Sequence, residues 1–89
     1  MNKKHLRTLN GIFADPVRAN IDWHDVESLL SALRADLAEA RGSRVTVVLN
    51  GVKAVFHEPH PRKEIGKGMV QALREFLASA GIEPPARTN

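Results

Sequence analysis

The chain has no cysteine and no tyrosine, and its aromatic residues are limited to three Phe and one Trp among 89 residues. Without cysteine, disulfides, thiolate metal sites and cysteine nucleophiles are excluded. With so few rings, an aromatic platform for stacking single-stranded bases is not expected, because such a platform needs several exposed aromatic side chains. These absences leave histidine and the charged side chains as the main candidates for chemistry.

Long apolar runs are also missing, and none approaches the length of a membrane span. The first five residues are basic, but no apolar stretch suitable for a signal peptide follows them. We therefore expect a cytoplasmic protein with no membrane partner. With 43% hydrophobic and 26% charged residues, a chain of this length is expected to fold as one small domain around a single core.

The net charge of +3 is small, but the charges are unevenly distributed along the chain. Acidic residues are concentrated within residues 22–39, whereas cations are concentrated within residues 41–67. This asymmetry favours a polyanion on one side of the fold, and a solvated surface of mixed charge is the alternative interpretation. The cations of the basic segment are Arg41, Arg44, Lys53, Arg62, Lys63 and Lys67.

The dipeptide Asn50-Gly51 predicts a β-hairpin, because both residues tolerate the positive φ that a two-residue type I′ turn requires. The turn sets the register of the two strands, and side chains alternate between the two faces. On one face Arg44 then lies directly opposite His57, at the end of the hairpin away from its turn. The other face is wholly apolar and must be covered; it carries Val45, Val47, Leu49, Val52, Ala54 and Phe56.

Apolar residues at helical spacing predict two helices before the hairpin. The first covers residues 3–13, with Leu6, Leu9 and Phe13 on one face, and it packs on this domain or on a partner. The second begins after Asp22, which is a good N-cap residue. The pattern alone allows this helix to continue to Gly42, because the residues between are good helix formers. Its apolar stripe is Trp23, Val26, Leu29, Leu30 and Leu33.

A last helix follows the proline-bounded segment after the hairpin. It begins near Gly66 and Gly68 and ends at Gly81, a typical C-cap residue. Two amphipathic helices and one apolar sheet face can cover one another, so we predict an α+β two-layer sandwich. We expect an N-terminal helical extension in residues 1–20, the folded domain in residues 21–83, and a frayed tail in residues 84–89.

With this order of elements, residues 23–82 resemble the HicA family of bacterial toxins from type II toxin–antitoxin systems. The resemblance covers about two-thirds of the chain. Its motifs are short, and their order and spacing are more specific than any one of them. The motifs that carry it are Gly42-Ser43, Pro59-His60, Lys67-Gly68 and Ala80-Gly81-Ile82.

The resemblance implies a fold like that of the double-stranded-RNA-binding domain, α-β-β-β-α. It also implies a small ribonuclease that cleaves mRNA without a metal ion and is neutralised by a HicB antitoxin. A third strand is then expected at about residues 35–41, where the helical pattern by itself extends the second helix. We adopt the strand, because a two-stranded ribbon would cover two helices poorly and tertiary context often overrides helix propensity.

One residue departs from the family's pattern. The residue after Gly-Ser is typically a catalytic histidine in HicA toxins, and this chain has Arg44 there. An arginine side chain stays protonated at physiological pH and cannot act as a general base. Either the activity is lost or another group supplies the imidazole, and His57 is the candidate because the predicted register places it beside Arg44.

Cleavage of RNA without a metal requires a base, an acid and a cation near the phosphate. We assign the base to His57 and the stabilising cation to Arg44, for which Arg41 or Lys53 are alternatives. His60, which matches the Pro-His motif, is expected to make the second proton transfer or to orient the first group. A loop contact to a backbone carbonyl is the alternative role for His60. The residues expected to bind RNA are Arg41, Ser43, Lys53, Arg62, Lys63 and Lys67.

Other roles for these residues are less well supported by the pattern. No Ser-His-Asp arrangement is indicated around Ser43, which we interpret as a turn residue. Lys67 begins a helix whose backbone N–H groups suit a phosphate, although an ordinary helix start explains it equally. The spacing His57-x-x-His60 matches known zinc sites poorly. We therefore expect no metal and no cofactor.

Three functions remain as hypotheses. The first is a ribonuclease toxin whose partners are mRNA and a HicB-like antitoxin. The second is a module on the same fold that binds RNA or an antitoxin without catalysis, which Arg44 at the family's histidine position favours. A purely structural interaction domain is a third option, favoured only if the basic segment does not affect RNA affinity.

Overall fold

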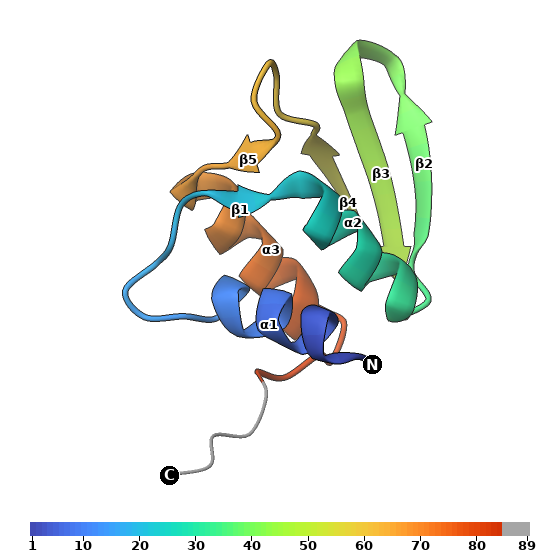
Figure 1. The fold of residues 1–89 in the computed structure, drawn as a ribbon. Helices are drawn as coiled ribbons and strands as arrows, with labels where there is room; N and C mark the ends of the chain where they lie inside the picture. The colour runs from blue at the N-terminus through green and yellow to red at the C-terminus, as the bar shows by residue number, and fades with distance from the viewer. Residues whose placement is uncertain (85–89) are drawn as a thin grey trace, which may run out of the picture.

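In a computed structural model that describes residues 1–84, a three-stranded antiparallel sheet is covered on one face by helices (Figure 1). The predicted fraying of residues 84–89 falls, apart from Pro84, outside the described residues. The elements in chain order are α1 (Lys3–Ile12), β1 (Ile21–Asp22), α2 (Trp23–Ala32), β2 (Asp36–Ala40), the 3₁₀ turn η1 (Arg41–Ser43), β3 (Arg44–Leu49), β4 (Val52–His57), β5 (Glu64–Ile65) and α3 (Lys67–Ser79).

The β3–β4 hairpin has the predicted register, with Leu49 opposite Val52 and Arg44 opposite His57. Its turn residues Asn50 and Gly51 have φ values of 50° and 81°, as the type I′ turn requires. The Asn50 side chain also donates a hydrogen bond of 2.8 Å from Nδ2 to the carbonyl oxygen of Ala80. Asn50 therefore forms the turn and also satisfies a carbonyl group at the end of α3.

The third strand implied by the family resemblance is present, and the extension of the second helix to Gly42 is wrong. Helix α2 ends at Ala32, and β2 pairs antiparallel with β3 in the order β2-β3-β4. The helix ends because Arg34 adopts a left-handed conformation, with φ of 69°, and the N–H of Ala35 donates to the carbonyl of Leu30. This is a Schellman C-cap built on an arginine, so the sequence lacks the glycine that usually marks it.

From α2 to α3 the main elements follow the predicted α-β-β-β-α order, in two layers. The core lies between the sheet and the helices, and it confirms the predicted apolar face of the hairpin. Phe56 is 5% exposed and packs edge-to-face on Phe76, with ring centroids 5.7 Å apart. Trp23, predicted to lie in the core, is fully buried. The hairpin also buries Val45, Val47 and Leu49.

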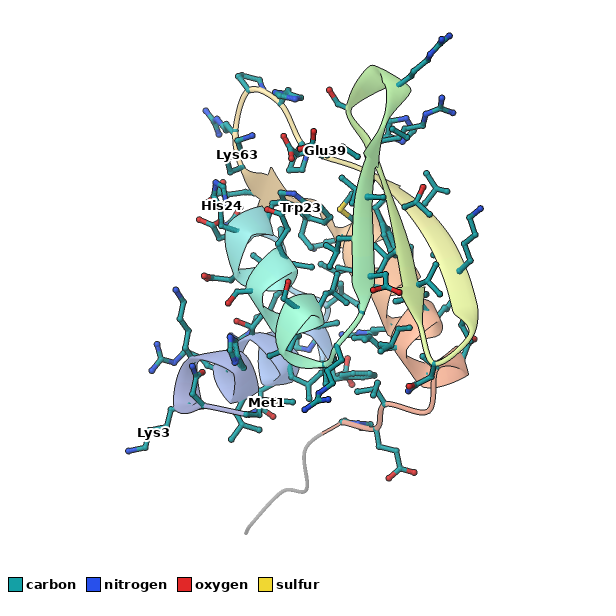
Figure 2. All side chains as sticks on the ribbon, turned by 90° about the vertical axis from the view of Figure 1, so that its right-hand side faces the viewer. Met1, Lys3, Trp23, His24, Glu39 and Lys63 are labelled. Carbon is teal, nitrogen blue, oxygen red and sulfur yellow. The ribbon has the colours of Figure 1, made fainter. Side chains whose placement is uncertain are left out.

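Helix α1 packs on α2 and α3, on the side of those helices away from the sheet (Figures 1 and 2). Its buried apolar residues are Leu9 and Ile12, whereas Leu6, predicted to lie on the same face, is 41% exposed. The buried face of α1 is therefore rotated relative to the predicted face, because α1 packs against both α2 and α3. Arg74 of α3 holds the end of α1 by donating hydrogen bonds to the carbonyls of Ile12, at 2.5 Å, and Ala14.

A short antiparallel ribbon between β1 and β5, in which Ile21 pairs with Ile65, was not predicted. Each strand has two residues, so neither contains an alternating pattern that could indicate it. The ribbon continues into a hydrogen bond of 2.6 Å from the N–H of Trp23 to the carbonyl of Lys63. It holds the segment after β4 against the start of α2, which determines where His60 and Lys63 lie.

Candidate functional site

The face of the sheet opposite the helices carries the pair Arg44 and His57. The register aligns one residue from each strand in a row, and the row farthest from the hairpin turn is Ala40, Arg44 and His57. All three are exposed, and the helices within residues 1–84 lie on the other face (Figure 1). We call this surface the open face. It presents one guanidinium and one imidazole on neighbouring strands.

The two side chains of this pair differ in how they are held. Arg44 is fixed in its row by a hydrogen bond of 2.8 Å from its Nε to the carbonyl of Arg41. Within residues 1–84 the imidazole of His57 forms no hydrogen bond or ion pair, so it is free to meet a ligand. Arg44 and His57 are therefore opposite each other in the predicted register, and the backbone of Arg41 contacts the Arg44 side chain.

Lys53 lies on the open face but far from this pair. It is opposite Val48, beside the hairpin turn, and is four positions before His57 on β4. At ~3.3 Å per residue, the two positions are separated by roughly 13 Å along the strand. Lys53 therefore does not belong to the group around Arg44 and His57, although a longer polyanion on the open face would reach both.

A second group of polar residues lies where β4 leaves the sheet, around the carboxylate of Glu58. Lys63 Nζ donates to Glu58 Oε2 at 3.0 Å, and His60 Nε2 lies 3.8 Å from the same oxygen. The Ser43 hydroxyl is hydrogen-bonded to His60 Nε2 at 3.2 Å. We call these four residues the Glu58 network. Three of them were predicted as site residues, but Glu58 was not.

Backbone hydrogen bonds position the network. The N–H of Glu58 donates to the carbonyl of Ser43 at 2.8 Å, which extends the β3–β4 ladder by one step. Ser43 itself has a φ of 60°, an unfavourable conformation for a residue with a side chain. The turn of η1 thus places Ser43 next to Arg44 in the chain while turning its hydroxyl toward His60.

The proximity of Ser43, His60 and Glu58 does not form a catalytic triad. In a triad the base uses one ring nitrogen for the hydroxyl and the other for the carboxylate. Here Ser43 and Glu58 both approach Nε2 of His60. The structure therefore agrees with the interpretation of Ser43 as a turn residue rather than a nucleophile.

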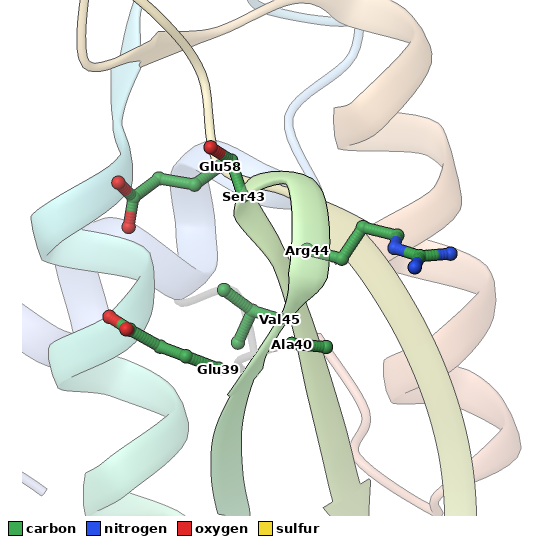
Figure 3. Close-up of a pocket in the computed structure, with 6 residues that line it drawn as sticks. All are labelled: Glu39, Ala40, Ser43, Arg44, Val45 and Glu58. Carbon is green, nitrogen blue, oxygen red and sulfur yellow. The ribbon is translucent and has the colours of Figure 1, made fainter.

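A cavity of about 220 Å³ lies beside the network and is lined by Glu39, Ala40, Ser43, Arg44, Val45 and Glu58. Figure 3 shows the Glu39 and Glu58 side chains extending toward α2 and the Arg44 side chain extending the opposite way. Arg44 and Glu58 thus extend in opposite directions in this view. The group around Arg44 and the Glu58 network are joined in the chain at the step from Ser43 to Arg44.

The Lys63 ammonium, which donates a hydrogen bond to Glu58, holds the pKa of that carboxyl below its ordinary value of 4.5. The nearby imidazole of His60 acts on this pKa in the same direction. Glu58 is therefore an ionised carboxylate in this network at neutral pH.

Acid is expected to destabilise the protein in part through Glu58. Because its pKa is lower in the folded protein than in the unfolded chain, its stabilising contribution is present above pH 4.5 and is lost as the pH falls through the folded pKa. Thermal unfolding of the wild type and of Glu58→Gln, followed between about pH 6 and about pH 3, checks this linkage. The wild type should lose more stability than the variant; parallel losses would contradict the expectation.

The remaining predicted cations lie outside both groups. Arg62 is exposed in the loop between β4 and β5, and Lys67 is the exposed first residue of α3. Gly66 is the N-cap of α3 and supplies no side-chain hydrogen bond, so the first N–H groups of the helix lack a side-chain cap. Among residues 1–84, no three His, Asp or Glu side chains are placed to hold a metal ion.

Glu58 is the member of the site that the sequence pattern did not indicate. Pro59 and Pro61 follow it closely in the chain, and they predict only that the strand ends there. A glutamate five residues before a lysine in a loop has no defined geometry, unlike a closely spaced pair on a helix. The pairing depends on backbone contacts of the loop with Ser43 and Trp23, and no signal in the sequence indicates those.

Among known protein families, the chain is similar to one over most of its length. Residues 23–82 match the family model described as the HicA toxin of bacterial toxin–antitoxin systems. No curated protein and no solved structure matches the chain. The matched residues begin at α2 and extend past α3, so they contain the three-stranded sheet, the open face and the Glu58 network, whereas α1 precedes them. No helix described here, α1 included, is long and apolar enough to cross a membrane.

Proposed function

Because the chain belongs to the HicA toxin family of bacterial toxin–antitoxin systems, we propose that it is a toxin that cleaves mRNA without a metal ion and is neutralised by a HicB-like antitoxin. The observation that carries the proposal is the pairing of His57 with Arg44 on the open face. An imidazole beside a fixed guanidinium supplies a proton acceptor and a cation at one place. His57 thereby supplies the imidazole that is missing at Arg44, the position where the family typically has a histidine.

The proposed reaction is attack of the RNA 2′-oxygen on the adjacent phosphorus. His57 removes the 2′-hydroxyl proton, and Arg44 stabilises the negative charge that develops on the phosphate oxygens. The bond from phosphorus to the 5′-oxygen breaks, and His60 donates a proton to that oxygen. The products are a 2′,3′-cyclic phosphate and a free 5′-hydroxyl. His57 lies opposite Arg44, and His60 is hydrogen-bonded to Ser43, the residue before Arg44, which supports these two roles.

The residues predicted to bind RNA are proposed to hold the RNA chain. Arg41, Arg62 and Lys67 are exposed, and Ser43 and Lys63 lie in the Glu58 network. Lys53 is placed to contact a phosphate farther along the same strand. We propose a cytoplasmic location, where mRNA and an antitoxin are both accessible, and we assign no metal or cofactor to the reaction.

A non-catalytic module that binds RNA or an antitoxin is the second candidate. Arg44 favours it, because this residue cannot replace a histidine as a base. The free imidazole of His57 also favours it, since a catalytic base is commonly oriented by another group. On this alternative the open face and the basic segment bind a partner and leave RNA intact.

Cleavage of end-labelled RNA by the purified protein in EDTA tests the proposal. We expect cleavage that is unchanged by EDTA and leaves 2′,3′-cyclic phosphate ends, because the assigned groups need no metal. RNA that is bound but remains intact would favour the non-catalytic module. Absence of both binding and cleavage of RNA would contradict the proposed ribonuclease. Of the two binding roles of the non-catalytic module, only antitoxin binding would then remain.

A further inference from the structure

We propose that Ser43, His60 and Lys63 form a binding site for a phosphate diester, and that the carboxylate of Glu58 occupies this site in the free protein. RNA must then displace Glu58 in order to bind there. The identity of the anion as RNA rests on the proposed function. The site itself is assigned from the geometry of the Glu58 network.

Donors that hold a carboxylate are suited to hold a phosphate. Both groups are oxyanions that accept charge-assisted hydrogen bonds from ammonium and imidazolium groups. Lys63 Nζ and His60 Nε2 both approach Glu58 Oε2, at 3.0 Å and 3.8 Å, and Ser43 adds a hydroxyl next to His60. A phosphate oxygen at the position of Glu58 Oε2 would meet the Lys63 ammonium and the His60 imidazole, and the Ser43 hydroxyl beside His60 is available to a second phosphate oxygen.

The segment that carries these donors does not need the Glu58–Lys63 ion pair to stay in place. Its first residue is held by the hydrogen bond from the N–H of Glu58 to Ser43. Its end is held by the hydrogen bond from Trp23 to the carbonyl of Lys63 and by the β1–β5 ribbon. Since the main chain is held at both ends, removal of the Glu58 charge leaves the backbone that carries the donors in place.

The ion pair is also accessible enough to exchange. The Lys63 side chain is 39% exposed and the Glu58 side chain is 24% exposed. Ion pairs with this much contact with solvent contribute little to stability, so another anion can replace one partner. While Glu58 remains, it cancels the charge of Lys63 and repels an approaching phosphate. Glu58 therefore weakens RNA binding by the free protein.

Binding of a 2′-O-methylated RNA oligonucleotide to the wild type and to Glu58→Gln tests the proposal. This RNA lacks the 2′-hydroxyl and cannot be cleaved by the proposed reaction, so affinity is measured without turnover. We expect Glu58→Gln to bind roughly three- to tenfold more tightly at low salt, as expected for release of one partly exposed cation. The slope of log affinity against log salt should steepen by about 0.7, the value for one more phosphate contact on a single strand.

Glu39→Gln is the matched control, because Glu39 lines the same cavity but forms no ion pair among the described residues. It removes the same charge without releasing Lys63 and should change the affinity by less than about twofold. Adding Lys63→Gln to Glu58→Gln should abolish the gain. An equal gain in Glu39→Gln, or a gain that survives Lys63→Gln, would overturn the proposal.

Titration with inorganic phosphate, followed by the NMR signals of the His60 imidazole, separates this site from the proposed function. Saturable shifts of His60 in Glu58→Gln that are weaker in the wild type support the phosphate site, even if the wild type does not cleave RNA and the proposed function fails. Cleavage by the wild type without any gain in RNA or phosphate binding in Glu58→Gln would overturn the phosphate site and leave the proposed function intact.

Discussion

Replacing His57 by alanine is expected to lower the rate of RNA cleavage by a factor of about 10² to 10⁴, the usual contribution of a general base or acid. The imidazole is exposed on the open face, directly opposite Arg44. Removing it takes away the group assigned to accept the 2′-hydroxyl proton. Arg44 remains but cannot take over, because the guanidinium has no free lone pair to accept a proton at physiological pH.

The fold should tolerate this change. His57 is at the end of β4, and within residues 1–84 its side chain forms no hydrogen bond that the substitution would break. His24→Ala is the matched control, since His24 is another exposed histidine, whose ion-pair partner within the described chain is Glu27 at 3.6 Å. Cleavage of end-labelled RNA is compared between the wild type and the two variants, in protein samples of matched helicity so that all are equally folded. The control should cleave like the wild type.

Retained cleavage by His57→Ala would contradict the assignment of the base. His60 would then be the remaining imidazole near the Ser43–Arg44 step, and His60→Ala would be expected to abolish the activity alone. Loss of cleavage in both variants is the result expected from the proposed reaction, in which one histidine accepts a proton and the other donates one.

Replacing Phe56 by alanine is expected to lower the free energy of unfolding by about 3 to 5 kcal/mol, the usual cost of removing a buried aromatic side chain. Phe56 is 5% exposed and packs against Phe76 between the sheet and α3. The substitution removes this edge-to-face contact and leaves a cavity that the surrounding helices cannot fill. For a domain of this size, the loss is a large part of the total stability.

Val55→Ala is the matched control for Phe56→Ala. Val55 is the preceding residue on β4, but it lies on the open face and is 51% exposed. Its truncation should change the free energy of unfolding by less than about 0.5 kcal/mol, as for most exposed positions. Urea denaturation of both variants measures the difference. Equal losses would contradict the assignment of Phe56 to the buried face and of Val55 to the open face.

The hairpin was predictable because its signals are local. Asn50 and Gly51 favour positive φ wherever they occur, and this turn determines the pairing of all residues from Arg44 to His57. The last helix was likewise predicted to be amphipathic between Gly66 and Gly81, and α3 buries Val70, Leu73, Phe76 and Leu77. Signals within a short stretch of chain are thus sufficient to place His57 beside Arg44.

The third strand was not predictable from residue propensities. The residues of β2 include good helix formers, and the left-handed residue that ends α2 is Arg34 rather than the glycine that usually indicates a helix end. The strand forms because its backbone groups pair with β3, a gain that the isolated segment does not have. The family resemblance indicated it, together with the need for a wider sheet to cover two helices, and the observed pairing of β2 with β3 confirms the strand.

The hairpin register, the buried faces of α2 and α3, and the pairing of Arg44 with His57 are all encoded locally, because each follows from a turn or a periodicity. Two other features follow only from how the elements pack. Helix α1 packs through Leu9 and Ile12, and Ser43, His60 and Lys63 gather around Glu58. These contacts join residues from separate elements. Apolar burial and the hydrogen bonds from Arg74 hold α1, and the backbone hydrogen bonds from Glu58 to Ser43 and from Trp23 to Lys63 position the Glu58 network, so neither follows from a local pattern.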